Sequence, residues 1–425
     1  MTNFYDELAS RGLVHTASEG VREALAAART SGYVGFDPTA DSLHVGHLLP
    51  ALALARLQRA GHRAIAVVGG GTGMIGDPSG KTAERQLLTR PQVEANVAAL
   101  RTQLSSFLDF DGENAALLVD NYEWLGSLGM IEFLRDVGKH FTVNYMLAKD
   151  SVARRIEAEE GISYTEFAYM LLQAYDFSVL HARYGCTLQL GGSDQWGNIT
   201  AGMELIRRTS GKGAHGIVLP LVTTASGVKF GKTEAGAVWL DPQRTSPFRF
   251  YQFWLNTDDR DAEHYLNAFT FLPVDEVAAL MRTQQQDPAA RAAQRRLAEE
   301  VTRLVHGADG VARAERATAV LFGSRPAQEL PAAELLDVFA DVPSTELARD
   351  RLGGDGLAVT ELLAETRVAA SKGEARRLLT GGGVYLNGER LDSPDRRVRL
   401  DDAIDGQVIL LRKGRRDNHV VRLVG

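Results

Sequence analysis

The sequence has few of the features that would place it outside the ordinary globular proteins. Its 425 residues include a single cysteine, Cys186, so an intrachain disulfide and a cysteine-rich zinc site are both excluded. The longest apolar stretches, such as Leu48–Ala55, fall far short of the roughly 18 residues that a membrane span needs. No basic segment followed by an apolar run opens the sequence, so we expect no signal peptide. We therefore expect a cytoplasmic protein without membrane association.

What the chain does have is length and an uneven distribution of charge. At roughly 150 residues a domain, 425 residues suggest about three domains. The net charge is −7, yet residues 357–425 hold 13 Lys and Arg against 10 Asp and Glu, which leaves 34 against 44 elsewhere. A small basic tail on an acidic body suggests an anionic partner for the tail. Chance clustering on a solvated surface would give the same pattern.

Residues 1–220 alternate short β-branched runs with helical patterns. Strands are predicted over 32–36, 63–69, 117–120 and 186–191. Helices are predicted over 43–60, from Thr89 onward, and over 164–184. This alternation predicts an α/β fold with a Rossmann-like parallel sheet, in which ligands bind at the carboxyl ends of the strands.

The rest of the chain changes character twice. We expect the Rossmann-like domain to cover 1–222 and a mostly helical domain, opened by a glycine-flanked loop, to cover 223–322. A linker with some local helix is expected over 323–355, followed by a small α+β domain over 356–425. In this last domain, residues 384–388 are predicted to form a strand closed by an Asn-Gly turn.

Two histidines follow the first predicted strand, in Asp37-Pro-Thr-Ala-Asp-Ser-Leu-His-Val-Gly-His47. They stand three residues apart in the opening turn of a predicted helix, where backbone N–H groups and the helix dipole favour anions. Gly46 between them leaves room for a flat group against the backbone. Two imidazoles beside such a site suit phosphate oxygens. A metal site is less favoured, because no third ligand lies nearby in the sequence.

Two further segments could bind a charged ligand. The glycine-rich stretch Gly69–Lys81 is too irregular for a phosphate-binding P-loop, but its Asp77 could hold a cation such as an ammonium group. Lys229-Phe-Gly-Lys-Thr233 offers two cations and a hydroxyl that could close on phosphate charge during a reaction. Taken alone, each segment is better explained as a solvated surface loop.

Taken together, these sequences resemble the class I aminoacyl-tRNA synthetases. His44-Val-Gly-His47 is similar to their His-Ile-Gly-His signature, and Lys229–Thr233 is similar to their Lys-Met-Ser-Lys-Ser signature. Three segments resemble the bacterial tyrosyl-tRNA synthetases more specifically: Tyr33–His44, Tyr169–Asp176 and Gly191–Asn198. Residues 367–387 resemble an S4-type RNA-binding domain, which identifies 356–425 as the S4-like part. The resemblance covers nearly the whole chain.

The departures from these signatures are small. Val45 stands in place of isoleucine, and Phe230-Gly231 in place of Met-Ser. Val34 occupies a position where relatives often have a cysteine that touches the ribose of ATP. The last departure affects one contact to the nucleotide.

The resemblance implies an activity. The enzyme would activate L-tyrosine with ATP to form tyrosyl-adenylate and pyrophosphate, and would then transfer tyrosine to the 3′ end of tRNA(Tyr). It implies a homodimer, and Mg²⁺ that enters with ATP and needs no cage of protein ligands. Tyr169, Gln173 and Asp176 fall on one face of the predicted helix, and Tyr33 and Asp176 could both bond the substrate hydroxyl.

The resemblance also implies roles for individual residues. Those expected to act on the phosphates are His44, His47, Lys81, Arg85, Lys229, Lys232 and Thr233. Those expected to bind tyrosine are Tyr33, Asp77, Tyr169, Gln173 and Asp176. Those expected to bind ATP are Gly35, Asp37, Thr39, His44, Gly46, His47, Gly191, Asp194, Gln195 and Lys232. Those expected to contact RNA are Lys372, Arg376 and Arg377.

Two other functions stay open from the sequence. An RNA-binding or regulatory protein on an inactive synthetase scaffold would have broken signatures, whereas both signatures are intact here. A tryptophan-specific relative would lack the S4-like tail and the pair Tyr33 and Asp176.

Overall fold

The computed structural model describes the chain except for residues 1–2, 80–87, 158–160, 226, 228–229, 234–235, 323 and 415–416. Two compact units are present. The first comprises Met1–Thr245 with Phe253–Val305, and the second comprises Ser246–Gln252 with His306–Gly425. Among the described residues, no helix combines the length and the apolar character that a membrane span requires.

A six-stranded sheet forms the centre of the first unit, with the strand order β1-β6-β5-β2-β3-β4. The strands are β1 (Thr16–Ala17), β2 (Ser31–Phe36), β3 (Arg63–Val68), β4 (Leu117–Asp120), β5 (Cys186–Gly192) and β6 (His215–Leu219). Neighbours from β6 to β4 run parallel, and only the short β1 is antiparallel to its neighbour. This confirms the expected parallel α/β sheet.

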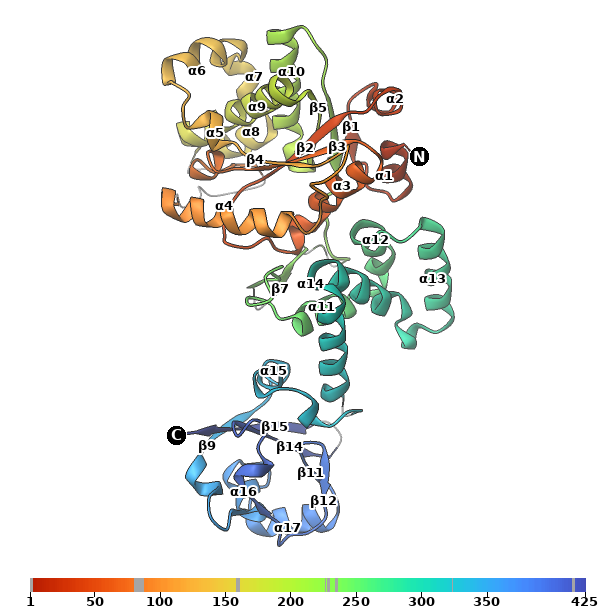
Figure 1. The fold of residues 1–425 in the computed structure, drawn as a ribbon, viewed down its shortest axis with the longest axis vertical. Coiled ribbons are helices and arrows are strands. Elements are labelled where there is room, and N and C mark those ends of the chain that lie inside the picture. The colour runs from red at the N-terminus through yellow and green to blue at the C-terminus, as the bar shows by residue number, and fades with distance from the viewer. Residues whose placement is uncertain are drawn as a thin grey trace. The chain divides into compact units, whose positions relative to one another are not determined.

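Helices cover both faces of this sheet. Helices α9 and α10 pack over one face and α3 and α4 over the other (Figure 1). The helices before β6 are α1 (Phe4–Ser10), α2 (Val21–Ala27), α3 (Leu48–Arg59), α4 (Arg90–Leu104), α5 (Tyr122–Leu125), α6 (Met130–Asp136), α7 (Val143–Leu147), α8 (Asp150–Glu157), α9 (Tyr164–Tyr184) and α10 (Trp196–Ser210). The direction of strand addition reverses between β2 and β5, so their carboxyl ends flank the crevice where such sheets bind ligands.

Local sequence explains where the longest of these helices begins and ends. The hydroxyl of Ser163 accepts the N–H of Glu166 at the start of α9, and Gly185 ends the helix with a φ of 64°. The predicted range 164–184 is confirmed. Helix α4 likewise begins after Thr89, which forms a capping box with Gln92.

The helix predicted over 43–60 begins later than expected, because α3 starts at Leu48 after a 3₁₀ turn, Val45–His47. The reason is a pairing that the local pattern does not reveal. The backbone of His44 is extended, and its neighbours Leu43 and Val45 bond to Leu240 and Val238, which lie almost 200 positions further along the chain. Residues held in that way cannot also join a helix.

A short hairpin and helices α11 to α14 follow the sheet. They are β7 (Lys232–Thr233), β8 (Gly236–Ala237), α11 (Pro247–Leu255), α12 (Asp259–Phe269), α13 (Val274–Gln286) and α14 (Ala292–Leu321). Helix α14 is interrupted at Gly307, where φ is 72°.

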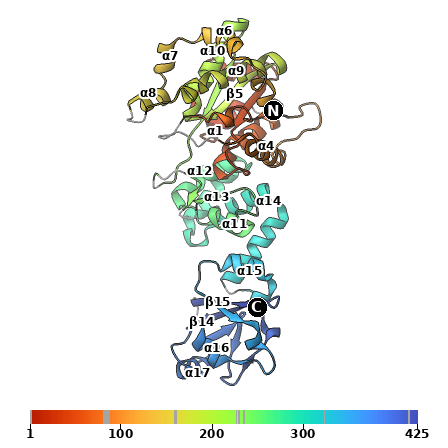
Figure 2. The same cartoon turned by 90° about the vertical axis from the view of Figure 1, so that its left-hand side faces the viewer.

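The second unit contains a five-stranded sheet with the order β12-β11-β14-β15-β9. Its neighbouring strands β14 and β15 are labelled in Figure 2. Its strands are β9 (Ser344–Ala348), β11 (Val384–Leu386), β12 (Glu389–Leu391), β14 (Val408–Lys413) and β15 (Asp417–Val424), and β10 (Leu357–Ala358) pairs with β13 (Arg397–Val398). Its helices after α14 are α15 (Ala332–Val338), α16 (Val359–Glu365) and α17 (Lys372–Thr380). The predicted Asn387-Gly388 turn joins β11 to β12 with φ values of 51° and 94°, as a type I′ turn requires.

The stretch 323–355, where we expect a linker with some local helix, contains α15 and β9. Strand β9 pairs in parallel with β15 at the edge of the C-terminal sheet. Leu335 and Phe339 are buried in a core that also includes Val408 and Val420. The described part of this stretch is therefore packed against residues that follow it by some 70 to 80 positions.

Candidate active site

A cavity of about 370 Å³ opens at the carboxyl ends of β2 and β5, at the reversal in strand order. Every residue expected to bind tyrosine or ATP lines it except Lys232: Tyr33, Gly35, Asp37, Thr39, His44, Gly46, His47, Asp77, Tyr169, Gln173, Asp176, Gly191, Asp194 and Gln195. Residues far apart in the sequence are thus brought to one place.

The remaining expected site residues lie elsewhere or outside the description. Lys81, Arg85 and Lys229 are outside the described residues. Lys232 and Thr233 form strand β7, and the structure describes their backbone but not their side chains. Lys372, Arg376 and Arg377 lie exposed on α17 in the second unit, where Lys372 pairs with Glu361.

One part of the cavity is shaped to bond a hydroxyl. The hydroxyl of Tyr33 is buried and has no hydrogen-bond partner in the described part of the chain. Asp176 is also buried, and its two oxygens accept from Trp124 Nε1 at 2.7 Å and from Asn121 Nδ2 at 2.9 Å. A buried polar group without a partner costs free energy, so a ligand that bonds Tyr33 is favoured. Because Asn121 and Trp124 both donate to Asp176, they fix the direction in which its carboxylate points.

Burial disfavours the charged form of both groups. It raises the pKa of Asp176 from 3.8 to about 7, although the bonds from Asn121 and Trp124 oppose the rise. The pKa of Tyr33 is likewise raised well above its ordinary value, first by burial and then by the charge of Asp176. Tyr33 therefore stays a neutral donor at physiological pH.

The raised pKa of Asp176 predicts a dependence of stability on pH. Between 3.8 and about 7, the folded carboxyl holds a proton that the unfolded one has lost. The contribution of this group to the free energy of unfolding therefore falls as pH rises through that window. Urea unfolding of the unliganded protein at about pH 5 and about pH 7.5 tests this. Between these two pH values, the free energy of unfolding should fall by about 2 kcal/mol more in the wild type than in Asp176→Asn. An unchanged difference would mean that the carboxyl is ionised throughout.

A second part of the cavity presents a fixed carboxylate. Asp77 Oδ2 accepts from Gln195 Nε2 at 2.8 Å, and its Oδ1 accepts the backbone N–H of Ser79 at 2.8 Å. Gln173 Nε2 donates to Gln195 Oε1 at 3.1 Å, which continues the network across α9. The hydroxyl of Tyr169 lies 3.4 Å from both oxygens of Asp37. A held carboxylate with amide and phenol oxygens around it suits an ammonium group.

The two histidines have a defined hydrogen-bonding state. Nδ1 of His44 accepts the backbone N–H of Gly46 at 3.1 Å, and Nδ1 of His47 accepts the backbone N–H of His44 at 3.1 Å. The rings stack with centroids 4.0 Å apart. Because each Nδ1 is an acceptor, each neutral ring carries its proton on Nε2. The pair therefore presents two Nε2–H donors, which suit phosphate oxygens.

Gly46 is required by the position of the first of these rings. A Cβ at residue 46 would lie 2.8 Å from Cε1 and 3.0 Å from Nδ1 of His44. Any side chain there would displace the imidazole, so the glycine serves the histidine as well as leaving room for a ligand.

Four residues at this site are not among those expected from the sequence. Asn121 and Trp124 hold Asp176, and Asn198 donates to Gln173 Oε1 at 2.8 Å. Gln189 pairs in register with Tyr33 across β5 and β2, lines the cavity and has a buried Oε1 without a hydrogen-bond partner among the described residues. A polar residue inside an otherwise apolar buried strand was the available signal for Gln189.

Within the ranges that the structure describes, no group of three or more His, Cys, Asp or Glu side chains could hold a metal ion. The acidic residues at the cavity instead bond to amides, hydroxyls and backbone N–H groups.

Comparison with known proteins agrees with this geometry. The family model of the class I tRNA synthetases (W and Y) matches residues 26–323, and that of the tyrosine–tRNA ligase SYY-like C-terminal domain matches residues 334–421. The tyrosine–tRNA ligase of Roseiflexus castenholzii is 58% identical and that of Anaeromyxobacter dehalogenans (strain 2CP-1) 55% identical, with 100% of each chain covered.

A solved structure is similar as well. A C-terminally truncated mitochondrial tyrosyl-tRNA synthetase from Aspergillus nidulans superposes with a TM-score of 0.69 at 33% identity, covering 76% of this chain and 95% of the other. The sequence left open an inactive synthetase scaffold and a tryptophan-specific relative. The two full-length relatives decide between these alternatives, because both are named tyrosine–tRNA ligases. The chain therefore belongs to the tyrosine–tRNA ligases, the class I aminoacyl-tRNA synthetases that join tyrosine to its tRNA.

Proposed function

We propose that the cavity at β2 and β5 binds L-tyrosine and ATP side by side and forms tyrosyl-adenylate. Tyr33 and Asp176 bond the substrate hydroxyl, and Asp77, Tyr169 and Gln173 hold its ammonium group. The nucleotide is bound by the residues that follow β2 and β5, which are Gly35, Asp37, Thr39, Gly191, Asp194 and Gln195. The observation that carries this proposal is the buried Tyr33 hydroxyl, which has no partner among the described residues and shares a cavity with the Asp176 carboxylate.

The first chemical step needs positioning and charge stabilisation. The tyrosine carboxylate attacks the α-phosphorus of ATP in line, and pyrophosphate leaves from the opposite side. His44 and His47 donate from Nε2 to the triphosphate as negative charge shifts toward the leaving group. Lys81, Arg85, Lys229, Lys232 and Thr233 bind the pyrophosphate, as the resemblance of their sequences implies. ATP enters as its Mg²⁺ complex, with the metal held by phosphate oxygens and water.

The second step transfers tyrosine to RNA. A hydroxyl of the 3′-terminal ribose of tRNA(Tyr) attacks the carbonyl of the adenylate, and AMP leaves. In this proposal, 1–222 is catalytic, 223–322 carries the signature loop and helices, and 356–425 binds the tRNA. The expected linker, 323–355, leads into the C-terminal part and packs against it. In that last part the exposed cations of α17 are Lys372, Arg376 and Arg377.

The enzyme acts in the cytoplasm as a homodimer in this proposal. Support for a contact surface comes from large apolar side chains that are exposed within a single stretch, including Met130, Ile131, Val143 and Tyr164. A contiguous patch of exposed apolar side chains marks a protein–protein contact, and this stretch supplies side chains for one. A second copy of the chain is the expected partner, and sedimentation of a stable monomer at micromolar concentration would contradict it.

The hydroxyl-binding role is tested by Tyr33→Phe. Removing this donor should cost roughly 1 kcal/mol in the recognition of tyrosine, since one hydrogen bond to the substrate is lost. The ratio of kcat/KM for tyrosine over phenylalanine, measured by ATP–pyrophosphate exchange, should fall about fivefold. Tyr5→Phe, which removes a hydroxyl outside the cavity, is the matched control and should leave the ratio unchanged. An unchanged ratio in Tyr33→Phe would remove Tyr33 from the tyrosine pocket.

A further inference from the structure

We propose that Trp239, braced by Arg244, is a positioning residue for His44. The segment 238–245, called the brace here, would set the direction of the His44 imidazole and hold the two signature sequences in register. This inference rests on the proposed role of His44 toward the triphosphate.

The backbone of the brace pairs with the first signature. Val45 N–H donates to the carbonyl of Val238 at 2.9 Å, and Leu240 N–H donates to the carbonyl of Leu43 at 2.8 Å. Between these two bonds, His44 and Trp239 stand opposite each other in an antiparallel bridge. The extended backbone of His44, with φ −121° and ψ 170°, follows from this pairing. Its imidazole therefore leaves the chain in the direction that the bridge sets.

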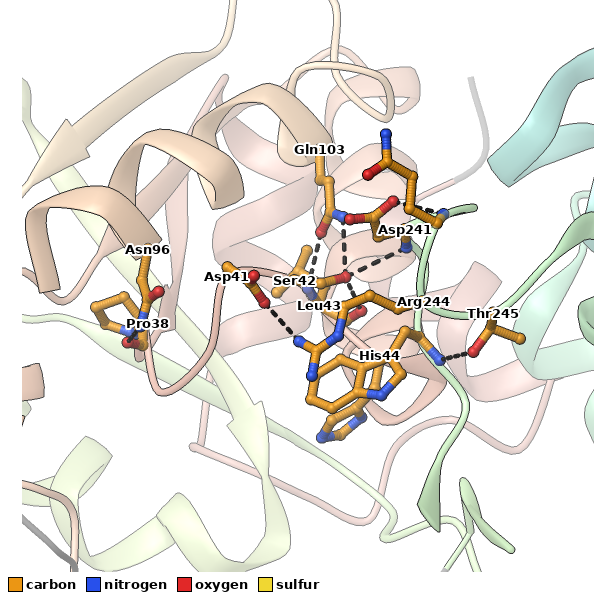
Figure 3. Close-up of polar contacts among 12 residues, drawn as sticks. Pro38, Asp41, Ser42, Leu43, His44, Asn96, Gln103, Asp241, Arg244 and Thr245 are labelled. Atoms are coloured by element: carbon orange, nitrogen blue, oxygen red, sulfur yellow. Dashed lines mark hydrogen bonds and ion pairs between the residues drawn. The ribbon is translucent and has the colours of Figure 1, made fainter. Parts of the chain in front are cut away.

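The side chain of Trp239 reinforces that direction. Its ring meets the ring of His44 edge to face, with centroids 6.0 Å apart and an interplanar angle of 67°. The guanidinium carbon of Arg244 lies 3.6 Å from the centroid of the indole ring, and Arg244 also forms an ion pair with Asp41 (Figure 3). The backbone N–H of Trp239 donates to Thr245 Oγ1 at 3.0 Å, which fixes the residue that carries the indole. The indole is thus held from its own segment and from the residues that precede His44.

Helix α4 anchors the other side of the pairing. Gln103 Oε1 accepts the N–H of Leu43 at 2.7 Å, and its Nε2 donates to the hydroxyl of Ser42 at 3.0 Å (Figure 3). The same hydroxyl accepts the N–H of Asp241 at 3.2 Å. These bonds join the sheet-covering helix, the first signature and the brace into one hydrogen-bonded unit.

The brace is also continuous with the second signature. Val238 N–H donates to the carbonyl of Gly231 at 3.2 Å, and a Cβ at Gly231 would lie 2.7 Å from Cγ2 of Val45. Phe230 is buried and stacks on Phe269 at 5.0 Å. A shift of the brace therefore moves both signatures, whereas Tyr33 and Asp176 stand on β2 and α9.

The test is a double-mutant cycle between Trp239 and His44 in the full-length chain. The measured quantity is the pre-steady-state rate of tyrosyl-adenylate formation at saturating ATP. Trp239→Ala should lower this rate about tenfold in the wild-type background and less than about twofold in His44→Ala, because the indole acts through the imidazole. Trp239→Phe, which keeps an aromatic edge, should recover most of the rate. The dissociation constant of tyrosine should change by less than about twofold in every variant.

Two variants guard against a general loss of structure. Arg244→Ala removes the guanidinium group that covers the indole, together with its ion pair to Asp41, and should lower the rate about threefold. Gln243→Ala, its exposed neighbour, should leave the rate unchanged. Equal losses from Trp239→Ala in both backgrounds would overturn the inference, because Trp239 would then act independently of His44. A normal rate in His44→Ala would instead refute the proposed role of His44, and the inference with it.

Discussion

Replacing His44 or His47 by alanine is expected to lower the rate of tyrosyl-adenylate formation by about 10²–10³. Each ring has its Nδ1 occupied by a backbone N–H, so its Nε2–H is oriented before ATP arrives. A donor that is already oriented needs little reorganisation free energy when charge develops on the phosphates. It therefore stabilises mainly the transition state. The loss should appear in kcat and kcat/KM together.

The measurement is a single-turnover experiment with tyrosine, ATP and pyrophosphatase, together with equilibrium dialysis of tyrosine alone. Tyrosine should bind to both variants as to wild type, because neither histidine belongs to the hydroxyl or ammonium sites. His→Gln variants, which keep an N–H donor, should retain more activity than the alanine variants. A rate within about threefold of wild type would show that the histidines have another role.

Reversing the three cations of α17 is expected to abolish efficient charging of tRNA while leaving tyrosine activation intact. The triple variant Lys372→Glu, Arg376→Glu, Arg377→Glu should raise the tRNA dissociation constant about 100-fold at low salt. The slope of log K against log salt should become shallower by about 3, since each lost phosphate contact no longer releases a counterion. These side chains are exposed and stand on a helix whose buried residues Ala375 and Leu379 are left unchanged.

Filter binding across a salt series and ATP–pyrophosphate exchange separate the two activities. Arg422→Glu, which removes an exposed arginine of β15, is the control for the loss of positive charge in general. If it weakens tRNA binding as much as Arg376→Glu does alone, α17 is not the specific contact. A loss of pyrophosphate exchange in the triple variant would mean that the change disturbs the catalytic unit.

Much of the site could be predicted because its residues lie in contiguous sequence motifs. The sequence placed Tyr169, Gln173 and Asp176 on one helix face, and Ser163 and Gly185 provide that helix with ordinary end signals. Asn121 and Trp124 were not predictable in this way, since they reach Asp176 across more than 50 positions in the sequence. Hydrophobic periodicity reports only neighbours along the chain.

The same limit explains the misplaced start of α3. Local pattern favours a helix from Leu43, whereas the competing partner, residues 238–240, is far away in the sequence. The packed elements within 323–355 arise likewise from partners that follow them, such as β15 for β9. In each case a contact with a distant segment determines the structure, although the local sequence pattern favours a different one.

The contact between Gly231 and Val45 has a consequence for exchanging signatures between synthetases. These are two of the positions at which the chain departs from the commonest signature residues, and the two departures touch each other. A serine at 231 would need a φ near 81° and would bring its Cβ against the valine. The two motifs are therefore not interchangeable modules: the isoleucine of the common signature carries the same γ-methyl group as Val45, so a chimera that imports a Met-Ser loop must also change the backbone at 231. Designers of such chimeras should transplant the loop together with the backbone segments that hold it.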